Sequence, residues 1–256
     1  MLPYRPYRPV IIEFGGDLYF FSLFGIFVNL AVLFGILTTL VRARQAKLPL
    51  LDVFNLGVCI SVVGLFCSRV FEVVFYSPEQ LLSSAGWWSL IDWYQSKSSF
   101  GGFLGGYIAF IVYSRVFKPG IPANLLSDIV MQGLLVAMIF GRIGCTLTHD
   151  HPGTESTFFL AFNYPEGPRH NLGFYEFLYL VLILQPAILY FRSRTPPAGA
   201  IAALILTLYA PARFLLDALR IGDSRYLGLT PAQYGCVLLL ICGLVWVRRT
   251  YRAAST

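Results

Sequence analysis

Residues Leu134–Gly144 read LLVAMIFGRIG and place one arginine, Arg142, near the end of an otherwise apolar run. An arginine inside a membrane-spanning segment is costly in free energy, so we expect it to face the protein interior and a specific partner. Two more arginines, Arg69 and Arg213, fall in apolar segments of the same kind. Three guanidinium groups in the body of a membrane protein indicate a site that holds an anion.

The composition of the whole chain is that of a membrane protein. Of the 256 residues, 57% are hydrophobic and only 12% are charged, and the mean hydropathy is +0.67. These values are far too apolar for a soluble domain. Leu18–Val41 and Tyr226–Val247 contain no charged side chain. Each is long enough to cross roughly 30 Å of hydrocarbon as a helix.

We therefore predict an all-α polytopic membrane protein, a single membrane-embedded domain over 1–256 with about seven transmembrane helices. The N-terminal segment Met1–Gly16 lacks the features of a removable signal, so the first span is expected to be retained. Residues 147–173 are the longest polar excursion and are predicted to form a small cap outside the membrane. The predicted spans are 17–41, 50–76, 100–114, 124–146, 174–191, 198–218 and 227–247.

Lysine and arginine predict the orientation. Those on one side of the predicted spans are Arg42, Arg44, Lys47, Arg115, Lys118, Arg192, Arg194, Arg248, Arg249 and Arg252. Those on the other side are Arg5, Arg8, Lys97, Arg169, Arg220 and Arg225. The positive-inside rule then puts the N-terminus outside and the C-terminus in the cytoplasm. The net charge of +6 is explained by this anchoring, which suits anionic lipid headgroups and is no evidence for nucleic acid.

Charged groups of several predicted spans converge toward the outer half of the membrane. Arg213, Asp217 and Arg220 are spaced i, i+4, i+7 and so share one helix face, on which Asp217 can pair with either arginine. Each pair taken alone is compatible with a purely structural ion pair. Together, the arginines keep spare donors for an anion if the carboxylates orient their forks. The set comprises Arg69, Arg142, Arg213, Arg220, Glu72, Asp150, Glu176 and Asp217.

The loop after the fourth predicted span carries histidines and the one cysteine that lies among polar residues, Cys145. His149 and His151 are two residues apart, and no recognised metal motif matches them, so no metal is predicted. The alternatives are solvation of the loop and proton transfer, because histidine titrates near neutral pH. Gly101-Gly102 and Gly105-Gly106 have the spacing of closely packed helices, and a backbone site for a lipid headgroup is the second interpretation.

These motifs resemble the prolipoprotein diacylglyceryl transferase family, over nearly the whole chain. Gly141-Arg142-Ile143-Gly144, with Asp150 and Gly153, resembles the family's G-R-x-G-N-F-x-N-G-E and its later glycine. Arg213-Phe214 with Asp217 and Arg220 resembles R-F-x-x-E-x-x-R. Further matches are Arg69 with Phe75-Tyr76, Arg169-His170 with Phe174-Tyr175-Glu176, Asp128 and Gln233.

The resemblance implies an enzyme of the bacterial cytoplasmic (inner) membrane, with its active site toward the extracytoplasmic side and no cofactor. It would transfer the diacylglyceryl group of phosphatidylglycerol to the lipobox cysteine thiol of an exported prolipoprotein, the first step of lipoprotein maturation. The implied catalytic residues are Arg142, Arg213, His149, His170 and Asp150. The implied substrate-binding residues are Arg69, Arg220, Glu176, Asp217, Gly153, Cys145, Gly101 and Gly102.

The chain departs from the family pattern where the family has its histidine and asparagines. The family's S-F-H-G-G appears here as Ser98-Ser99-Phe100-Gly101-Gly102, without a histidine, and the two asparagines after G-R-x-G are Cys145 and Thr148. Two alternatives therefore stay open. One is a diverged paralogue that binds anionic phospholipid or uses a different acceptor. The other is a transporter or channel, which would place its site near the membrane midplane.

Overall fold

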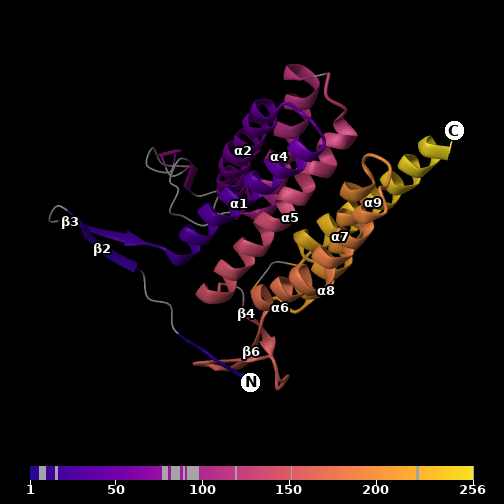
Figure 1. Ribbon diagram of the computed structural model, residues 1–256. Coiled ribbons are helices and arrows are strands. Elements are labelled where there is room, and N and C mark those ends of the chain that lie inside the picture. The colour runs from indigo at the N-terminus through magenta and orange to yellow at the C-terminus, as the bar shows by residue number, and fades with distance from the viewer. Residues whose placement is uncertain are drawn as a thin grey trace. The chain divides into compact units, whose positions relative to one another are not determined.

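Eight helices form the frame of the described chain (Figure 1). In this computed structural model the described residues are 1–5, 10–14, 17–76, 80–81, 87–88, 90, 98–118, 120–150, 152–222 and 225–255. The helices are α1 (Leu23–Gln45), α2 (Leu50–Tyr76), α4 (Ser99–Val112), α5 (Ala123–Thr148), α6 (Leu172–Tyr179), α7 (Gln185–Ser193), α8 (Ala200–Ala218) and α9 (Pro231–Ser255). A π-helical turn, η2 (Tyr113–Phe117), continues α4, and a second, η3 (Leu180–Leu184), joins α6 to α7.

The membrane character of these helices confirms the predicted fold class. Six helices in the described residues are long and apolar enough to cross a membrane, with α6, η3 and α7 together forming the span Leu172–Ser193. A shorter apolar helix covers Gly101–Phe117. The protein is therefore a multi-pass, all-α membrane protein. The chain divides into two compact units, Ile36–Val130 and a larger one made of Met1–Gly35 with Met131–Thr256.

The unit Ile36–Val130 is held together by close approach of α2 and α4. Its core contains Ala43, Val53, Leu56, Leu126 and Ile129. A Cβ built on Gly101 would lie 2.4 Å from the Cβ of Phe71, and one built on Gly105 would lie 2.4 Å from the Cβ of Cys67. These two glycines therefore let the backbones of α4 and α2 touch, which is the packing role that their four-residue spacing predicts.

The larger unit packs α5, the α6–α7 span and α8 around one apolar core. Its buried members are Leu135, Leu180, Leu184, Ile188, Ile201, Ile205 and Tyr209. Helix α9 lies along α8 (Figure 1), and a Cβ on Gly243 would meet Thr207 Oγ1 at 2.6 Å. The π-helical turn η3 comes just before Pro186. Proline has no N–H to continue the helical ladder, so a local irregularity at this point is expected.

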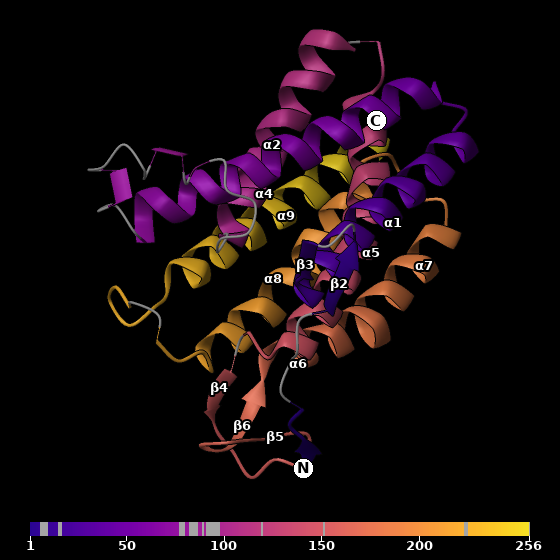
Figure 2. The same ribbon diagram turned by 90° about the vertical axis from the view of Figure 1, so that its left-hand side faces the viewer.

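A small four-stranded β-sheet caps this unit, and three of its strands come from the segment predicted as a cap. The strands β4 (Pro152–Glu155), β5 (Phe162–Tyr164) and β6 (Gly167–Asn171) join β1 (Leu2–Pro3) in the order β1-β5-β6-β4. β1 pairs with β5 in parallel, and the other pairs are antiparallel. Figure 2 shows β5 and β6 beside the N-terminus. The amide of Thr154 donates to the carbonyl of Leu219 at 2.9 Å, which ties the cap to the end of α8.

The predicted bounds of the first and last spans are wrong. The first was expected over 17–41, but Asp17–Phe21 is strand β3, paired antiparallel with β2 (Val10–Phe14), and the helix runs from Leu23 to Gln45. Hydropathy cannot distinguish an apolar strand from an apolar helix, so it predicts a single span where the chain forms β3 followed by α1. The last was expected to start at 227, whereas α9 starts at Pro231, the first-turn position that proline favours.

Candidate active site

Glu176 joins two arginines from different helices. It lies on α6 with only 1% of its surface exposed. Its Oε1 is 2.9 Å from Nε of Arg142 on α5, and its Oε2 is 3.3 Å from Nη1 of Arg213 on α8. The hydroxyl group of Tyr209 also donates to Oε1, at 2.7 Å. One carboxylate therefore fixes two guanidinium groups that would otherwise repel each other.

The start of α6 explains how Glu176 reaches Arg142. The side chain of Asn171 caps the helix by accepting a hydrogen bond from the amide of Phe174 at 3.0 Å. Gly173 lies against the end of α5, where a Cβ would come within 3.0 Å of the Cβ of Cys145. The missing side chain lets the two helix ends approach, so that Glu176, three residues later, lies opposite Arg142.

Arg213 is held a second time by its own helix. Its Nη2 is 2.8 Å from Oδ1 of Asp217, the i, i+4 pairing predicted from the sequence. Asp217 is fully buried, and its other oxygen accepts a hydrogen bond from the hydroxyl group of Thr230. The two carboxylates thus bind the two terminal nitrogens, Nη1 and Nη2, of the Arg213 guanidinium group.

Arg142 and Arg213, with Glu176 and Asp217, form an arginine cluster that has N–H donors to offer a ligand. Each guanidinium group has five N–H donors. The contacts with Glu176 and Asp217 use Nε of Arg142 and Nη1 and Nη2 of Arg213. Nη1 of Arg142 also lies 3.7 Å from Sγ of Cys145. Two guanidinium groups therefore carry more N–H groups than these four contacts use, and bidentate recognition of a tetrahedral anion suits what is left.

His149 is enclosed by the cap. Its ring lies 4.5 Å from that of Tyr4 and 5.3 Å from that of Tyr164. The Oδ1 of Asn171 is used as the helix cap, so its Nδ2 faces Nδ1 of His149 at 3.2 Å. An amide NH₂ only donates, so Nδ1 must be unprotonated and Nε2–H donates to the carbonyl of Arg5, 3.2 Å away. Burial also lowers the pKa of His149.

The neighbours of His149 on the loop have separate surroundings. The carboxyl group of Asp150 lies beside Thr148 and His149, and burial raises its pKa. Its predicted role in orienting the arginines stays a prediction. His151 lies outside the described residues.

His170 faces a tyrosine at the start of α6. Its Nδ1 is 2.9 Å from the hydroxyl group of Tyr175, and burial lowers the pKa of the imidazole. Gly153 packs against His170, since a Cβ built on Gly153 would be 3.0 Å from the Cβ of His170. Gly153 also forms a β-bridge with Arg220. The cap thus brings His170, Gly153 and Arg220 to the same end of α8.

Three predicted site residues belong to the unit Ile36–Val130. Arg69 is 2% exposed, and its Nη2 donates to Gln80 Oε1 at 3.1 Å. Gly101 packs against α2, and a Cβ on Gly102 would make an ordinary 3.5 Å contact with Ser68. Their role in substrate binding stays a prediction.

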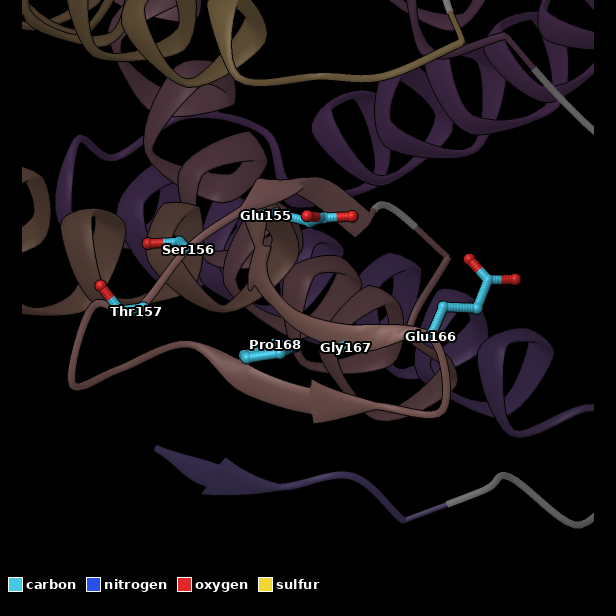
Figure 3. Close-up of a pocket in the computed structure, with 6 residues that line it drawn as sticks. All are labelled: Glu155, Ser156, Thr157, Glu166, Gly167 and Pro168. Atoms are coloured by element: carbon cyan, nitrogen blue, oxygen red, sulfur yellow. The ribbon is translucent and has the colours of Figure 1, made fainter.

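A separate pocket lies on the cap. Figure 3 shows its lining, which consists of Glu155, Ser156, Thr157, Glu166, Gly167 and Pro168. Its two carboxylates lie 3.1 and 3.8 Å from Arg169 Nη2. This pocket has an acidic lining and so does not suit a phosphate. Among the described residues, no group of three or more His, Cys, Asp or Glu side chains could hold a metal ion.

Tyr209 and Thr230 contact the carboxylates of the site but are not among the residues predicted from the sequence. Tyr209 sits in an apolar run, where a tyrosine reads as core, and no local signal marks its contact with Glu176. Thr230 did carry a signal. Thr230-Pro231-Ala232-Gln233 has the cap, the first-turn proline and the glutamine of a helix capping box.

Comparison with known proteins gives one family. A family model described as prolipoprotein diacylglyceryl transferase matches residues 9–249. Similar proteins named phosphatidylglycerol–prolipoprotein diacylglyceryl transferase occur in several bacteria. That of Clostridioides difficile is 26% identical over 250 aligned positions, covering 93% of each chain. That of Methylococcus capsulatus is 27% identical over 274 positions, covering all of both.

A third relative of the same name, from Nitratidesulfovibrio vulgaris strain Miyazaki F, is 31% identical over 173 positions, or 64% of this chain and 63% of that protein. The match of the family model spans the arginines, the carboxylates and strands β4, β5 and β6 of the cap. The chain therefore belongs to the prolipoprotein diacylglyceryl transferase family.

Proposed function

We propose that this protein transfers the diacylglyceryl group of phosphatidylglycerol to the lipobox cysteine of an exported prolipoprotein. The observation that carries the proposal is the buried Glu176, bound to both Arg142 and Arg213. The names of the relatives supply the donor and the acceptor. In the reaction, the cysteine sulfur forms a bond to the carbon of the diacylglyceryl group that carries the phosphate. The carbon–oxygen bond breaks, and glycerol phosphate leaves with the electron pair.

The arginine cluster suits the charge that develops in this step. The phosphate of the donor is anionic, and its ester oxygen gains negative charge as the bond breaks. Preorganised cations stabilise such charge strongly where water is scarce. Arg142 is 9% exposed, and Arg213 is half-buried. Their carboxylate partners fix both side chains before the substrate binds. We assign phosphate binding to these two residues, with Arg220 at the end of α8 as a third donor.

His170 is the better candidate for the base that takes the thiol proton. A thiol attacks as the thiolate, so a neutral base is needed nearby. The lowered pKa of His170 keeps the imidazole neutral near pH 7. The contacts of His149 engage both of its ring nitrogens. We therefore assign His149 a role in holding the cap.

We propose that the site faces the extracytoplasmic side of the cytoplasmic membrane, because an exported preprotein would present its cysteine there. The positive-inside bias supports the same orientation, with the C-terminus in the cytoplasm. A fluorescent protein fused after Thr256 that folds only in the cytoplasm should therefore be bright. A dark fusion, with a bright one at the N-terminus, would reverse the topology.

A direct assay tests the activity. Purified protein is incubated with phosphatidylglycerol vesicles and a lipobox peptide, and the peptide is analysed by mass spectrometry. We expect a diacylglyceryl thioether on the cysteine with the wild-type protein and none with Arg142→Ala. A wild-type protein that binds the lipid but leaves the peptide unmodified would refute the transferase activity. That result would favour the diverged, lipid-binding paralogue.

A further inference from the structure

Thr230 lies at the start of α9, beside the arginine cluster, and is completely buried. Its hydroxyl group donates to Oδ2 of Asp217. The hydroxyl oxygen of Thr230 also accepts a hydrogen bond from the amide of Gln233 at 3.1 Å. The amide of Thr230 in turn donates to Oε1 of Gln233 at 3.0 Å. This reciprocal pair is a helix capping box.

The capping box is also fixed to α8. Nε2 of Gln233 donates to the carbonyl of Phe214 at 3.2 Å, one residue after Arg213. Gln233 is 2% exposed, so none of these bonds competes with bulk water. The start of α9 therefore has a set position relative to the turn of α8 that carries Arg213 and Asp217.

The direction of the hydrogen bonds decides what Thr230 does. The oxygen of Thr230 accepts from Gln233, so its single proton is directed to Asp217. Asp217 then has one oxygen bound to Thr230 and the other bound to Nη2 of Arg213 at 2.8 Å. An ionised, fully buried carboxylate needs such donors, and it has one on each oxygen.

We propose that Thr230 is a positioning residue for the phosphate-binding arginine, acting through Asp217. It orients the Asp217 carboxylate, which in turn orients the Arg213 guanidinium group. This inference rests on the proposed function, since it gives Arg213 a phosphate to bind. It adds to the site Thr230, the residue just before α9.

Two variants of Thr230 separate its hydroxyl group from its shape. Thr230→Val keeps the shape but removes the donor to Asp217, and Thr230→Ser keeps the donor. Thr250→Val is the control, because Thr250 is another buried threonine, within α9, whose hydroxyl group bonds only within its own helix, to the carbonyl of Trp246 at 2.9 Å. Melting temperature, phosphatidylglycerol Kd in vesicles, and KM and kcat with the lipobox peptide are measured for each.

Loss of the hydrogen bond to Asp217 in Thr230→Val should let the Arg213 guanidinium group move out of position and so weaken phosphate binding. We expect Thr230→Val to raise the Kd and KM for phosphatidylglycerol by about tenfold or more, the size of effect that a lost hydrogen bond to a charged group produces. Thr230→Ser should stay within about threefold of wild type, and so should Thr250→Val. A residue that matters only for folding would lower kcat by reducing the active fraction, with KM unchanged.

The outcomes distinguish this inference from the proposed function. A wild-type protein that binds the lipid without turnover refutes the transferase activity, and the Kd values of the variants still decide the role of Thr230. Equal Kd and KM in Thr230→Val and Thr230→Ser would overturn the positioning role. So would a rise in KM with Thr250→Val as large as that with Thr230→Val. A wild-type protein that neither binds nor turns over phosphatidylglycerol would overturn both.

Discussion

At the scale of single residues, the site depends on one buried negative charge between two positive ones. Replacing Glu176 with glutamine keeps the volume but leaves Arg142 and Arg213 facing each other without their shared partner. Removing one member of a buried ion pair costs about 3–5 kcal/mol of folding free energy. We therefore expect Glu176→Gln to lower the melting temperature in detergent and to abolish transfer.

The control for that variant is Glu155→Gln. Glu155 also pairs with an arginine, Arg169, but its side chain is 73% exposed. An exposed pair contributes about 0–1 kcal/mol. A melting temperature that falls as much with Glu155→Gln as with Glu176→Gln would argue against the importance of the buried bridge.

The assignment of the base predicts a pH dependence. Burial lowers the pKa of His170 below its ordinary value, which is about 6.5. The neutral, active form therefore dominates at pH 7, and kcat/KM should fall only as the pH drops below about 6.5. We expect this acidic limb to disappear in His170→Gln, with a low, pH-independent rate. An unchanged limb in His170→Gln that vanished in His149→Gln would assign the base to His149 instead.

Single residues also show how far the sequence alone could go. The Arg213–Asp217 pair was predictable because both lie on one helix, where spacing fixes proximity. The contact of Tyr209 with Glu176 joins residues 33 positions apart, and no helical periodicity encodes it. Thr230 could have been noticed from its capping signature, but its bond to Asp217 depends on how α8 and α9 pack.

At the scale of elements, His149 holds the N-terminal strand on the cap. The strand β1 is attached through the amide of Leu2 to the carbonyl of Ala161 at 2.8 Å, and His149 binds the carbonyl of Arg5. Protonation would put a hydrogen on Nδ1 against the NH₂ of Asn171. The pKa of His149 is lowered in the folded state, so the detached state binds more protons in acid.

Attachment of β1 should therefore be fully stable above about pH 6.5 and weaken as the pH falls below that value. We expect the exchange protection of the Leu2 amide, corrected for intrinsic rates, to decrease as the pH falls below about 6.5. His149→Gln should remove this dependence. Protection that falls equally in His149→Gln would show that another group causes the dependence. Asp150 would act in the opposite direction, because burial raises its pKa and the folded state therefore binds more protons in acid.

The packing of α2 against α4 gives a second test at this scale. A Cβ on Gly101 would overlap Phe71 at 2.4 Å and the carbonyl of Cys67 at 2.6 Å, so Gly101→Ala must push the helices apart. Gly102 is its neighbour on the same helix, but a Cβ there meets Ser68 at an ordinary 3.5 Å. We expect Gly101→Ala to cost about 1–3 kcal/mol, and Gly102→Ala to be neutral or stabilising. Equal melting temperatures would contradict the close packing.

Element boundaries were where sequence reasoning failed. The run without charged residues from Leu18 predicts a helix, but its first residues belong to strand β3, which pairs with β2. An apolar composition predicts burial or pairing but does not set the backbone conformation. The spans of α2 and α5 were predicted closely because charged or turn residues bound them on both sides.

At the scale of the whole molecule, the composition predicted the membrane fold, and arginines in apolar segments predicted an anion site. Glu176 belonged to the predicted set, but its contact with both Arg142 and Arg213 depends on how the helices pack. The most direct test of this account is the affinity of the purified protein for phosphatidylglycerol relative to phosphatidylcholine, in nanodiscs of matched acyl chains. We predict a preference for phosphatidylglycerol in the wild type that is lost in Arg142→Ala and Arg213→Ala but kept in Arg169→Ala, whose arginine lies on the cap. A preference that survived both substitutions in folded protein would contradict the account.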